Sequence, residues 1–217
     1  MSQLVSVRNS DRHTMIISHY HKFIFVKTRK TAGSTFEKLV LPYLGKTDLC
    51  TGSLRDETPA LNMTINQNGH ISLADIMRKY FPDGCDYNIL TLERNPYDKV
   101  VSSYYWHQKI KEQQFGNMDF ETYMKTCNLL PQDWSLYTLN GKLPTTLRVF
   151  HYESMHELYL WLKEHRGIHI TLDKVGDTKL KSGIRKVKDY KELHTDTTRQ
   201  ITENLFSEEI QEFSYEF

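Results

Sequence analysis

The stretch 23–36 constrains the fold most, because it reads as a strand, a turn and the start of a helix. Residues 23–26 form a short apolar, β-favouring run, and a helical pattern extends from about 34 to 44. Backbone N–H groups and the positive end of a helix dipole would meet at the turn, which suits a phosphate or sulfate. The turn also carries basic side chains, a glycine and the hydroxyl residues Thr31, Ser34 and Thr35.

A second stretch repeats this arrangement. Residues 87–92 read as a buried strand, and the chain then turns into a helix that starts near Pro96, where a missing N–H costs nothing. Arg94 lies at the exit of the strand and Ser102 lies a little over two helical turns beyond it. Ligands in open α/β sheets bind at the carboxyl ends of strands, where both Lys30 and Arg94 fall.

Together the two stretches resemble the cofactor signatures of the sulfotransferases that use 3′-phosphoadenosine 5′-phosphosulfate (PAPS). The resemblance is closest to the carbohydrate-type branch, which includes the heparan sulfate 2-O-sulfotransferases, and it extends over most of the chain from about Lys22. It implies that Arg94 and Ser102 hold the 3′-phosphate, as a guanidinium grips phosphate in two-pronged fashion. The 5′-phosphosulfate would be held by Lys30, Thr31, Ala32, Gly33, Ser34 and Thr35.

The resemblance also implies a catalytic base and a closing loop. His70, in a Gly-His segment between the two signatures, would take the proton of the acceptor hydroxyl, since histidine titrates near neutral pH. His107 is the alternative base, and Glu37 is a more distant one. Sulfotransferases commonly close a basic loop over the 3′-phosphate, and here the corresponding residues are Ser182, Arg185 and Lys186.

Several of these residues have ordinary alternative roles. Arg94 could instead pair with Asp98 or Glu93 at the helix start, and the 179–188 run could be a solvated basic loop. Lys27 and Arg29 flank the turn and could point into the site or into solvent. Aromatic residues of the second helix could stack on the adenine or the acceptor, or could pack in the core: Tyr104, Tyr105 and Trp106.

Bulk properties narrow the class of protein. The 217-residue chain is long enough for one α/β domain, and its net charge of +1 does not point to nucleic acid or to an anionic membrane. Three widely spaced cysteines and the absence of HExxH or clustered Asp/Cys patterns predict neither a disulfide framework nor a metal site. With no long apolar run, we expect a cytoplasmic protein or the excised catalytic domain of a Golgi-type enzyme.

Alternation of strands and helices predicts a single three-layer α/β domain over residues 1–217. Its central parallel sheet, flanked by helices, should place the strands at 23–26 and 87–92 side by side, with a P-loop-like strand-loop-helix binding the phosphosulfate. Further helices are expected at 72–80, 96–112, 118–127, 154–166 and 196–213, with another strand at 147–152. The 45–67 region reads as a loop.

The predicted reaction is transfer of a sulfuryl group from PAPS to a hydroxyl, most simply of a carbohydrate, leaving 3′-phosphoadenosine 5′-phosphate (PAP). His70 would deprotonate the acceptor while the Lys30 ammonium stabilises the negative charge that grows on the leaving phosphate oxygen. A nucleotide-dependent kinase is the enzyme alternative, disfavoured because Lys30 precedes Gly33 rather than following a glycine-rich loop. A non-catalytic binder of phosphorylated or sulfated ligands is the other alternative. The sequence does not name the acceptor.

Overall fold

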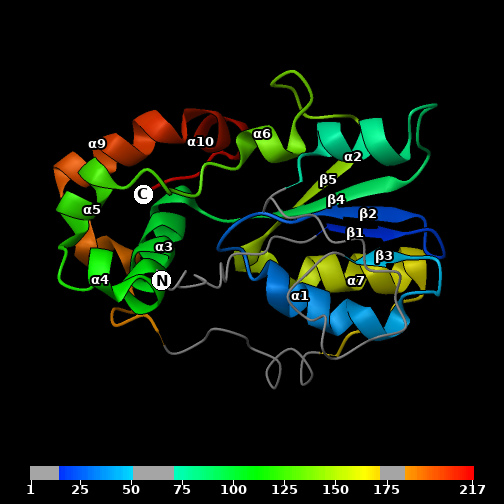
Figure 1. Ribbon diagram of the computed structural model, residues 1–217, viewed down its shortest axis with the longest axis horizontal. Helices are drawn as coiled ribbons and strands as arrows, with labels where there is room; N and C mark the ends of the chain where they lie inside the picture. The colour runs from blue at the N-terminus through cyan, green and yellow to red at the C-terminus, as the bar shows by residue number, and fades with distance from the viewer. Residues whose placement is uncertain (1–14, 51–70, 172–183) are drawn as a thin grey trace, which may run out of the picture.

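The core of the protein is one five-stranded sheet with strand order β3-β1-β2-β4-β5 (Figure 1). The computed structural model describes residues 15–50, 71–171 and 184–217. Within these ranges, nearly all residues of β1, β2 and β4 are buried, as in strands covered on both faces. The strands are β1 (Met15–Ser18), β2 (Phe23–Val26), β3 (Leu49–Cys50), β4 (Asn88–Glu93) and β5 (Leu147–His151).

The sheet is mixed, which corrects the expectation of a parallel sheet. Strands β2, β4 and β5 are parallel neighbours, and the expected pairing of 23–26 with the strand before Arg94 is confirmed by the registers Phe23–Asn88 and Val26–Thr91. Strand β1 is antiparallel to both β2 and β3. Only residues 19–22 join β1 to β2, and so short a connection cannot make the crossover that a parallel pair requires.

Helices follow the expected order, although several are shorter than the sequence suggested. The expected helix at 196–213 is two helices, because the buried Phe206 between them has non-helical backbone angles, φ −125° and ψ 29°. The α-helices are α1 (Gly33–Val40), α2 (Leu73–Tyr80), α3 (Pro96–Ile110), α4 (Glu112–Phe115), α5 (Phe120–Thr126), α6 (Trp134–Tyr137), α7 (His156–Arg166), α9 (Asp196–Leu205) and α10 (Ser207–Phe213). Short 3₁₀ helices are η1 (Leu41–Tyr43), η3 (Tyr152–Ser154) and η4 (Tyr190–Leu193).

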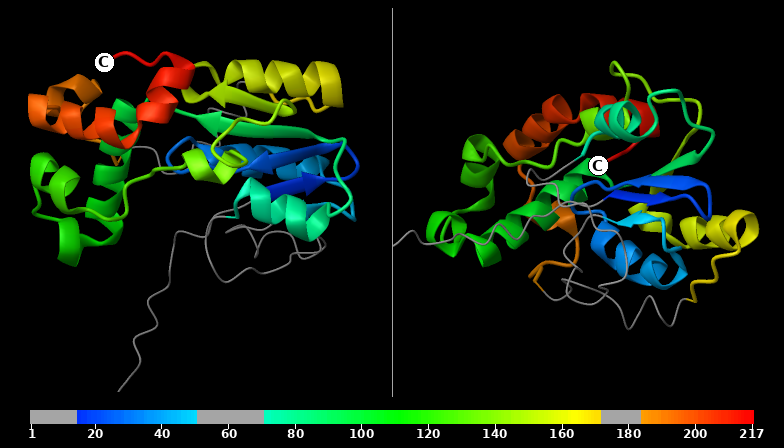
Figure 2. Two further views of the ribbon diagram at one scale, coloured as in Figure 1. Left: turned by 90° about the horizontal axis from the view of Figure 1, so that it is seen from above. Right: turned by 45° about the vertical axis from the view of Figure 1, so that its right-hand side comes forward.

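Helices cover both faces of the sheet (Figures 1 and 2). On one face, α1 and α7 bury Phe36 and Leu158 against Phe25 and Leu90. On the other face, α2 and α6 bury Ile76 and Tyr137 against the opposite sides of the same strands. Such burial of apolar side chains on both sides of a sheet is the main source of stability for an α/β fold.

A helical lobe lies beyond the carboxyl end of β4 (Figure 1). The chain passes from β4 into α3 through residues 94 and 95, and α3 packs with α5 and α9 around a second apolar cluster centred on Tyr104, Tyr123 and Phe206. No helix within the described ranges is long and apolar enough to span a bilayer. The junction between sheet and lobe is where the predicted site residues fall.

Candidate functional site

The turn after β2 has an unusual backbone. Lys30 and Ala32 both adopt left-handed conformations, with φ 64° and 62°, although neither is glycine. Ala32 precedes α1, and its carbonyl accepts hydrogen bonds from the N–H groups of Thr35 and Phe36 at 2.9 and 3.1 Å. The N–H groups that open a helix lack acceptors one turn back, so the start of α1 presents backbone donors and the positive end of the helix dipole.

Hydroxyl groups brace the turn from inside. The Thr28 hydroxyl donates to the carbonyl of Leu92 at the end of β4 and lies 2.9 Å from the Thr31 hydroxyl. Thr31 is fully buried, and Thr35 is buried as well, whereas Ser34 is half-buried at the helix start. Thr28 therefore ties the turn to the neighbouring strand, and Thr31 closes the turn onto Thr28.

Gly33 allows the turn to pack closely on a buried ion pair. A Cβ atom at this position would lie 2.8 Å from Cγ of Lys27. Lys27 is buried, and its Nζ lies 3.0 Å from Oε2 of Glu37, which is buried too. Lys27 thus points at Glu37, and neither of the two roles considered for it from sequence is correct.

One stripe of α3 runs alongside the turn. Four residues on one side of α3 follow one another at four-residue spacing: Arg94, which lies just before the helix, and Asp98, Ser102 and Trp106 within it. The helix is started by Pro96 and by the Asn95 side chain, which accepts from the N–H of Tyr97.

Lys30 contacts both ends of this stripe. Its carbonyl accepts from Nη1 of Arg94 at 2.9 Å, and its Nζ lies 4.7 Å from the centroid of the Trp106 ring. The predicted phosphosulfate and 3′-phosphate residues therefore lie side by side. The face of an indole ring attracts a nearby ammonium group. From sequence, Trp106 is expected only to stack on the ligand or to pack in the core; its position one turn after Ser102 is the signal for this contact.

Arg94 is held in place by several contacts. Its Nε donates to Oδ2 of Asp98 at 2.8 Å, its Nη2 donates to the same oxygen, and its guanidinium carbon lies 4.1 Å from the centroid of the Tyr152 ring. The pairing with Asp98 that the sequence left open is therefore present. Tyr152, in the 3₁₀ helix after β5, was not foreseen as a partner.

Arg185 joins this group from the far end of the chain. Its Nη1 donates to Oδ1 of Asp98, so one carboxylate bridges two guanidinium groups. The other edge of Arg185, Nε and Nη2, is buried and has no hydrogen-bond partner in the described part of the chain. Such an edge matches two oxygen atoms of a phosphate or carboxylate. Lys186 is exposed, and Ser182 lies outside the described residues.

The segment 184–194 that carries Arg185 lies along α3. Its His194 Nε2 lies 3.0 Å from the carbonyl of Tyr97. The pKa of the Tyr105 hydroxyl is raised by burial, an effect that the nearby Arg185 charge partly opposes. Tyr104 and Tyr105 belong to the apolar cluster of the helical lobe, which supports their core reading.

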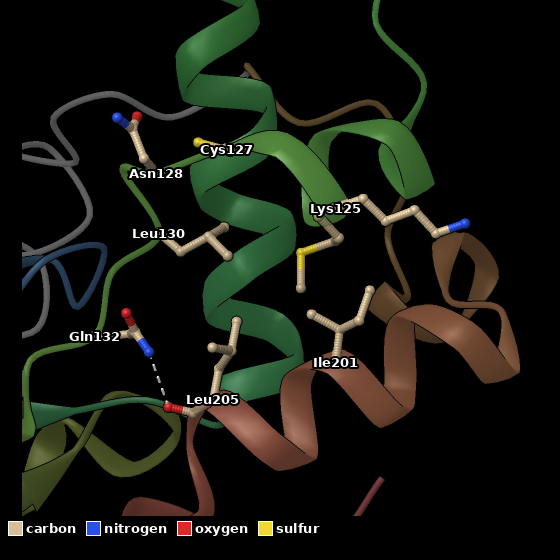
Figure 3. A pocket seen from close by; sticks show the side chains of 8 residues that line it. Lys125, Cys127, Asn128, Leu130, Gln132, Ile201 and Leu205 are labelled. Atoms are coloured by element: carbon tan, nitrogen blue, oxygen red, sulfur yellow. Dashed lines mark hydrogen bonds between the residues drawn. The ribbon is translucent and has the colours of Figure 1, made fainter.

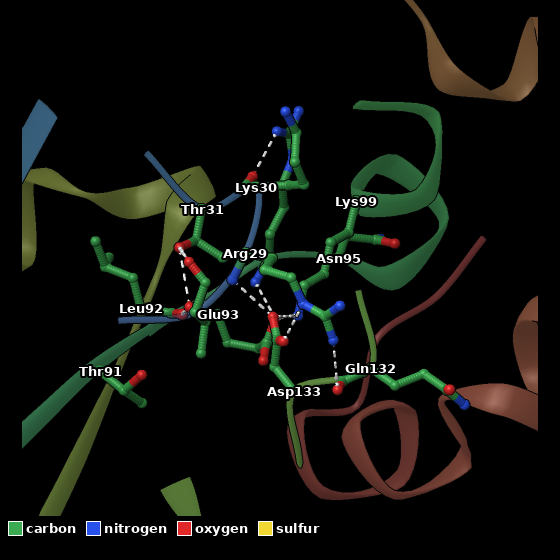
Figure 4. Close-up of polar contacts among 12 residues, drawn as sticks. Arg29, Lys30, Thr31, Thr91, Leu92, Glu93, Asn95, Lys99, Gln132 and Asp133 are labelled. Carbon is green, nitrogen blue, oxygen red and sulfur yellow. Dashed lines mark hydrogen bonds and ion pairs between the residues drawn. The ribbon is translucent and has the colours of Figure 1, made fainter. Parts of the chain in front are cut away.

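A buried ionic network fixes the base of the site (Figure 4). Nε of Arg29 lies 2.7 Å from Oδ1 of Asp133, whose Oδ2 lies 3.1 Å from Nζ of Lys99. Lys99 in turn lies 2.7 Å from Oε1 of Glu93, and Tyr137 donates to Oε2 of the same residue. Arg29 therefore anchors the turn to this network, while its side chain remains 25% exposed.

Charges in this network support one another. Burial opposes ionisation of Asp133, but Lys99 and Arg29 together hold its pKa below the usual value. Burial raises the pKa of Glu93 in spite of Lys99, while the carboxylates around Lys99 raise its pKa against the effect of burial. The turn and the start of α3 are therefore tied together by groups that are costly to separate.

Of the three candidate bases, the structure describes His107 and Glu37, whereas His70 lies outside the described residues. His107 is buried, its Nδ1 lies 2.9 Å from the Tyr123 hydroxyl, and its ring stacks on Phe115. Glu37 is buried beside Lys27. Both alternatives to His70 thus form part of the protein interior.

A pocket of about 420 Å³ lies near the site, between α9 and the segment that follows α5 (Figure 3). Apolar side chains of Leu130 and Leu205 line it together with Cys127 and Gln132. Gln132 donates from Nε2 to the carbonyl of Leu205, and its own carbonyl accepts from Arg29. The pocket contains none of the predicted site residues, but its wall contacts the turn through Arg29.

Comparison with known proteins adds no family assignment. No protein-family model matches the chain, and no curated protein matches it significantly. Across residues 15–50, 71–171 and 184–217, no group of three or more His, Cys, Asp and Glu side chains is placed to hold a metal ion. The arrangement of Lys30, Arg94, Ser102 and Arg185 therefore has to be interpreted from its own chemistry.

Proposed function

We propose that this chain is a PAPS-dependent sulfotransferase that transfers a sulfuryl group to a hydroxyl acceptor, most simply a carbohydrate. The observation that carries the proposal is the meeting of two kinds of anion-binding group at one end of the sheet. The turn before α1 and the Arg94–Arg185 pair come from distant parts of the sequence, yet Arg94 donates directly to the carbonyl of Lys30.

The residues present suit a ligand with two separate phosphate groups. Backbone N–H groups at the start of α1, with Lys30, suit the 5′-phosphosulfate. Arg185 has a buried donor edge without a partner in the described ranges, and Arg94 and Ser102 lie on the adjoining stripe of α3. These groups suit a 3′-phosphate, which AMP and ATP lack.

PAPS supplies the sulfuryl group on a phosphosulfate anhydride, and the protein would supply charge and proton transfer. The Lys30 ammonium, which lies against the Trp106 ring, would stabilise the electron pair that the breaking S–O bond leaves on the phosphate oxygen. The acceptor oxygen forms the new bond to sulfur, and His70 would take its proton. The turn is braced by Thr31 and Arg29, so Lys30 needs little reorganisation.

The experiment is transfer of labelled sulfuryl from PAPS to a panel of glycans, phenols and peptides. Lys30→Ala should lower turnover by roughly 10²–10³, the usual cost of one charge-stabilising donor, and His70→Ala by roughly 10²–10⁴. Lys38→Ala is the matched control, because it removes the same charge from a half-buried side chain of α1, and it should retain activity.

Two results would contradict the proposal. One is a wild-type protein that neither transfers label to any acceptor nor binds PAP. The other is full activity in Lys30→Ala, because the proposal assigns to the Lys30 ammonium the stabilisation of the charge on the leaving phosphate oxygen. Phosphoryl transfer from ATP in the same assay would instead favour the kinase alternative.

A further inference from the structure

Asp98 is the one residue that contacts both arginines of the proposed 3′-phosphate site among the described residues. Oδ2 accepts from Nε and Nη2 of Arg94, and Oδ1 accepts from Nη1 of Arg185. The side chains are mostly buried, with 8% exposure for Arg94, 14% for Asp98 and 24% for Arg185. Charge-assisted hydrogen bonds of this kind are strong and directional.

The contacts to Asp98 decide which donors of each arginine face elsewhere. With Nε and Nη2 of Arg94 on the carboxylate, its Nη1 is directed at the carbonyl of Lys30. With Nη1 of Arg185 on the carboxylate, its Nε and Nη2 edge is the one left without a partner in the described ranges. Asp98 also lowers the repulsion between two guanidinium groups that would otherwise lie close together in a partly buried place.

We propose that Asp98 is a positioning residue for the 3′-phosphate: it holds Arg94 against the turn and turns the Nε–Nη2 edge of Arg185 toward the phosphate. This inference rests on the proposed function. Asp98 is not expected to touch the phosphate, because two anions repel. Its effect on affinity therefore has two components of opposite sign, since its charge disfavours an anion while its hydrogen bonds arrange the groups that bind one.

Asp98 also attaches the segment 184–194 to α3. The Arg185–Asp98 ion pair lies at one end of this segment, and the hydrogen bond of His194 to the carbonyl of Tyr97 lies at the other. Loss of the Asp98 charge should therefore release the Arg185 end of the segment, while the His194 end keeps its contact. Asp98 should therefore favour binding of the 3′-phosphate in two ways, by orienting the Arg185 side chain and by attaching the segment 184–194 to α3.

The substitution Asp98→Asn shows which component dominates, because it keeps the shape but removes the negative charge together with one acceptor of the arginines. Calorimetry at fixed ionic strength should show PAP binding weakened by about tenfold or more, the cost of a misplaced charge-assisted phosphate contact. AMP, which lacks the 3′-phosphate, should change less than twofold and also reports that the variant is folded. Asp83→Asn, an exposed change of equal charge in the turn after α2, should leave both affinities unaltered.

A double-mutant cycle gives a second test through Arg185. If Asp98 acts by placing Arg185, Asp98→Asn should weaken PAP binding much less in an Arg185→Ala background than in the wild type. The proposal for Asp98 is overturned if Asp98→Asn binds PAP as tightly as the wild type, or more tightly as charge alone would predict. A wild type that binds PAP no better than AMP overturns the proposed function itself, a result that the wild-type titrations alone reveal.

Discussion

At the level of single residues, Ala32 and Gly33 in the turn before α1 are the reverse of what their backbone angles favour, since the left-handed position is the alanine and not the glycine. Ala32 has a left-handed conformation that suits glycine, with φ 62°, whereas Gly33 has no positive φ and is required by its neighbours. The sequence suggests that the glycine serves the approach of a phosphate. The structure gives a packing reason, because the space next to Gly33 is filled by Lys27.

This contrast predicts opposite effects of two substitutions on stability. Gly33→Ala should lower the free energy of unfolding by about 1–2 kcal/mol, since its Cβ meets a buried, ion-paired side chain at 2.8 Å. Ala32→Gly should raise it by roughly 0.5–1 kcal/mol by relieving the left-handed alanine. Urea denaturation measures both, and a Gly33→Ala protein as stable as the wild type would show that Lys27 can move without cost.

At the scale of elements, the junction of β4 and α3 depends on the buried network around Lys99. Lys99 is fully buried on α3 and lies between the carboxylates of Glu93 and Asp133. Because Asp133 also binds Arg29, the same network fixes the turn after β2. Two elements that approach the site are thus held at one point.

Removing Lys99 should destabilise the whole protein. Lys99→Met leaves two buried carboxylates without their common partner, and such a loss typically costs about 3–5 kcal/mol. Lys109→Met, at an exposed position of the same helix, should change the unfolding free energy by less than about 0.5 kcal/mol. Chemical denaturation of the two variants would contradict this account if both lost the same stability.

Across the whole molecule, the sequence predicts where helices and strands occur better than it predicts strand direction and side-chain pairing. The adjacency of the 23–26 strand and the strand before Arg94 followed from strand and helix alternation, and it is confirmed. One or two strands are predicted between residues 15 and 26, but the antiparallel direction of β1 is not, because a buried strand has the same apolar pattern in either direction. The Lys99–Asp133 pair was missed because its members are brought together only by folding, and an apolar setting on α3 was the sole local sign for Lys99.

The last helix also contacts the central network, and this predicts a pH dependence of stability. Burial raises the pKa of Glu209 on α10 to about 7, and its Oε1 has no hydrogen-bond partner within the described ranges. A carboxyl whose pKa is higher in the folded state stabilises the protein below its unfolded value of about 4.5, and this contribution is lost as the pH rises through 7.

Glu209→Gln should abolish this loss. The unfolding free energy of the wild type should fall relative to that of the variant between pH 5 and pH 8, by at most about 3 kcal/mol. Taking the difference between the two proteins at each pH cancels the titration of groups that they share. Parallel pH profiles from urea denaturation would contradict the raised pKa of Glu209.

We propose that Arg94, Arg185 and the turn before α1 form one site for a nucleotide that carries a 3′-phosphate. Calorimetric titration of the wild type with PAP and with AMP tests it most directly. PAP should bind about ten- to a hundredfold more tightly than AMP, which is the usual contribution of a charge-assisted phosphate contact. Arg185→Ala should erase most of that preference, while Lys188→Ala, an exposed change in the same segment, should keep it. Equal affinity of the wild type for PAP and AMP would show that these residues do not bind a 3′-phosphate.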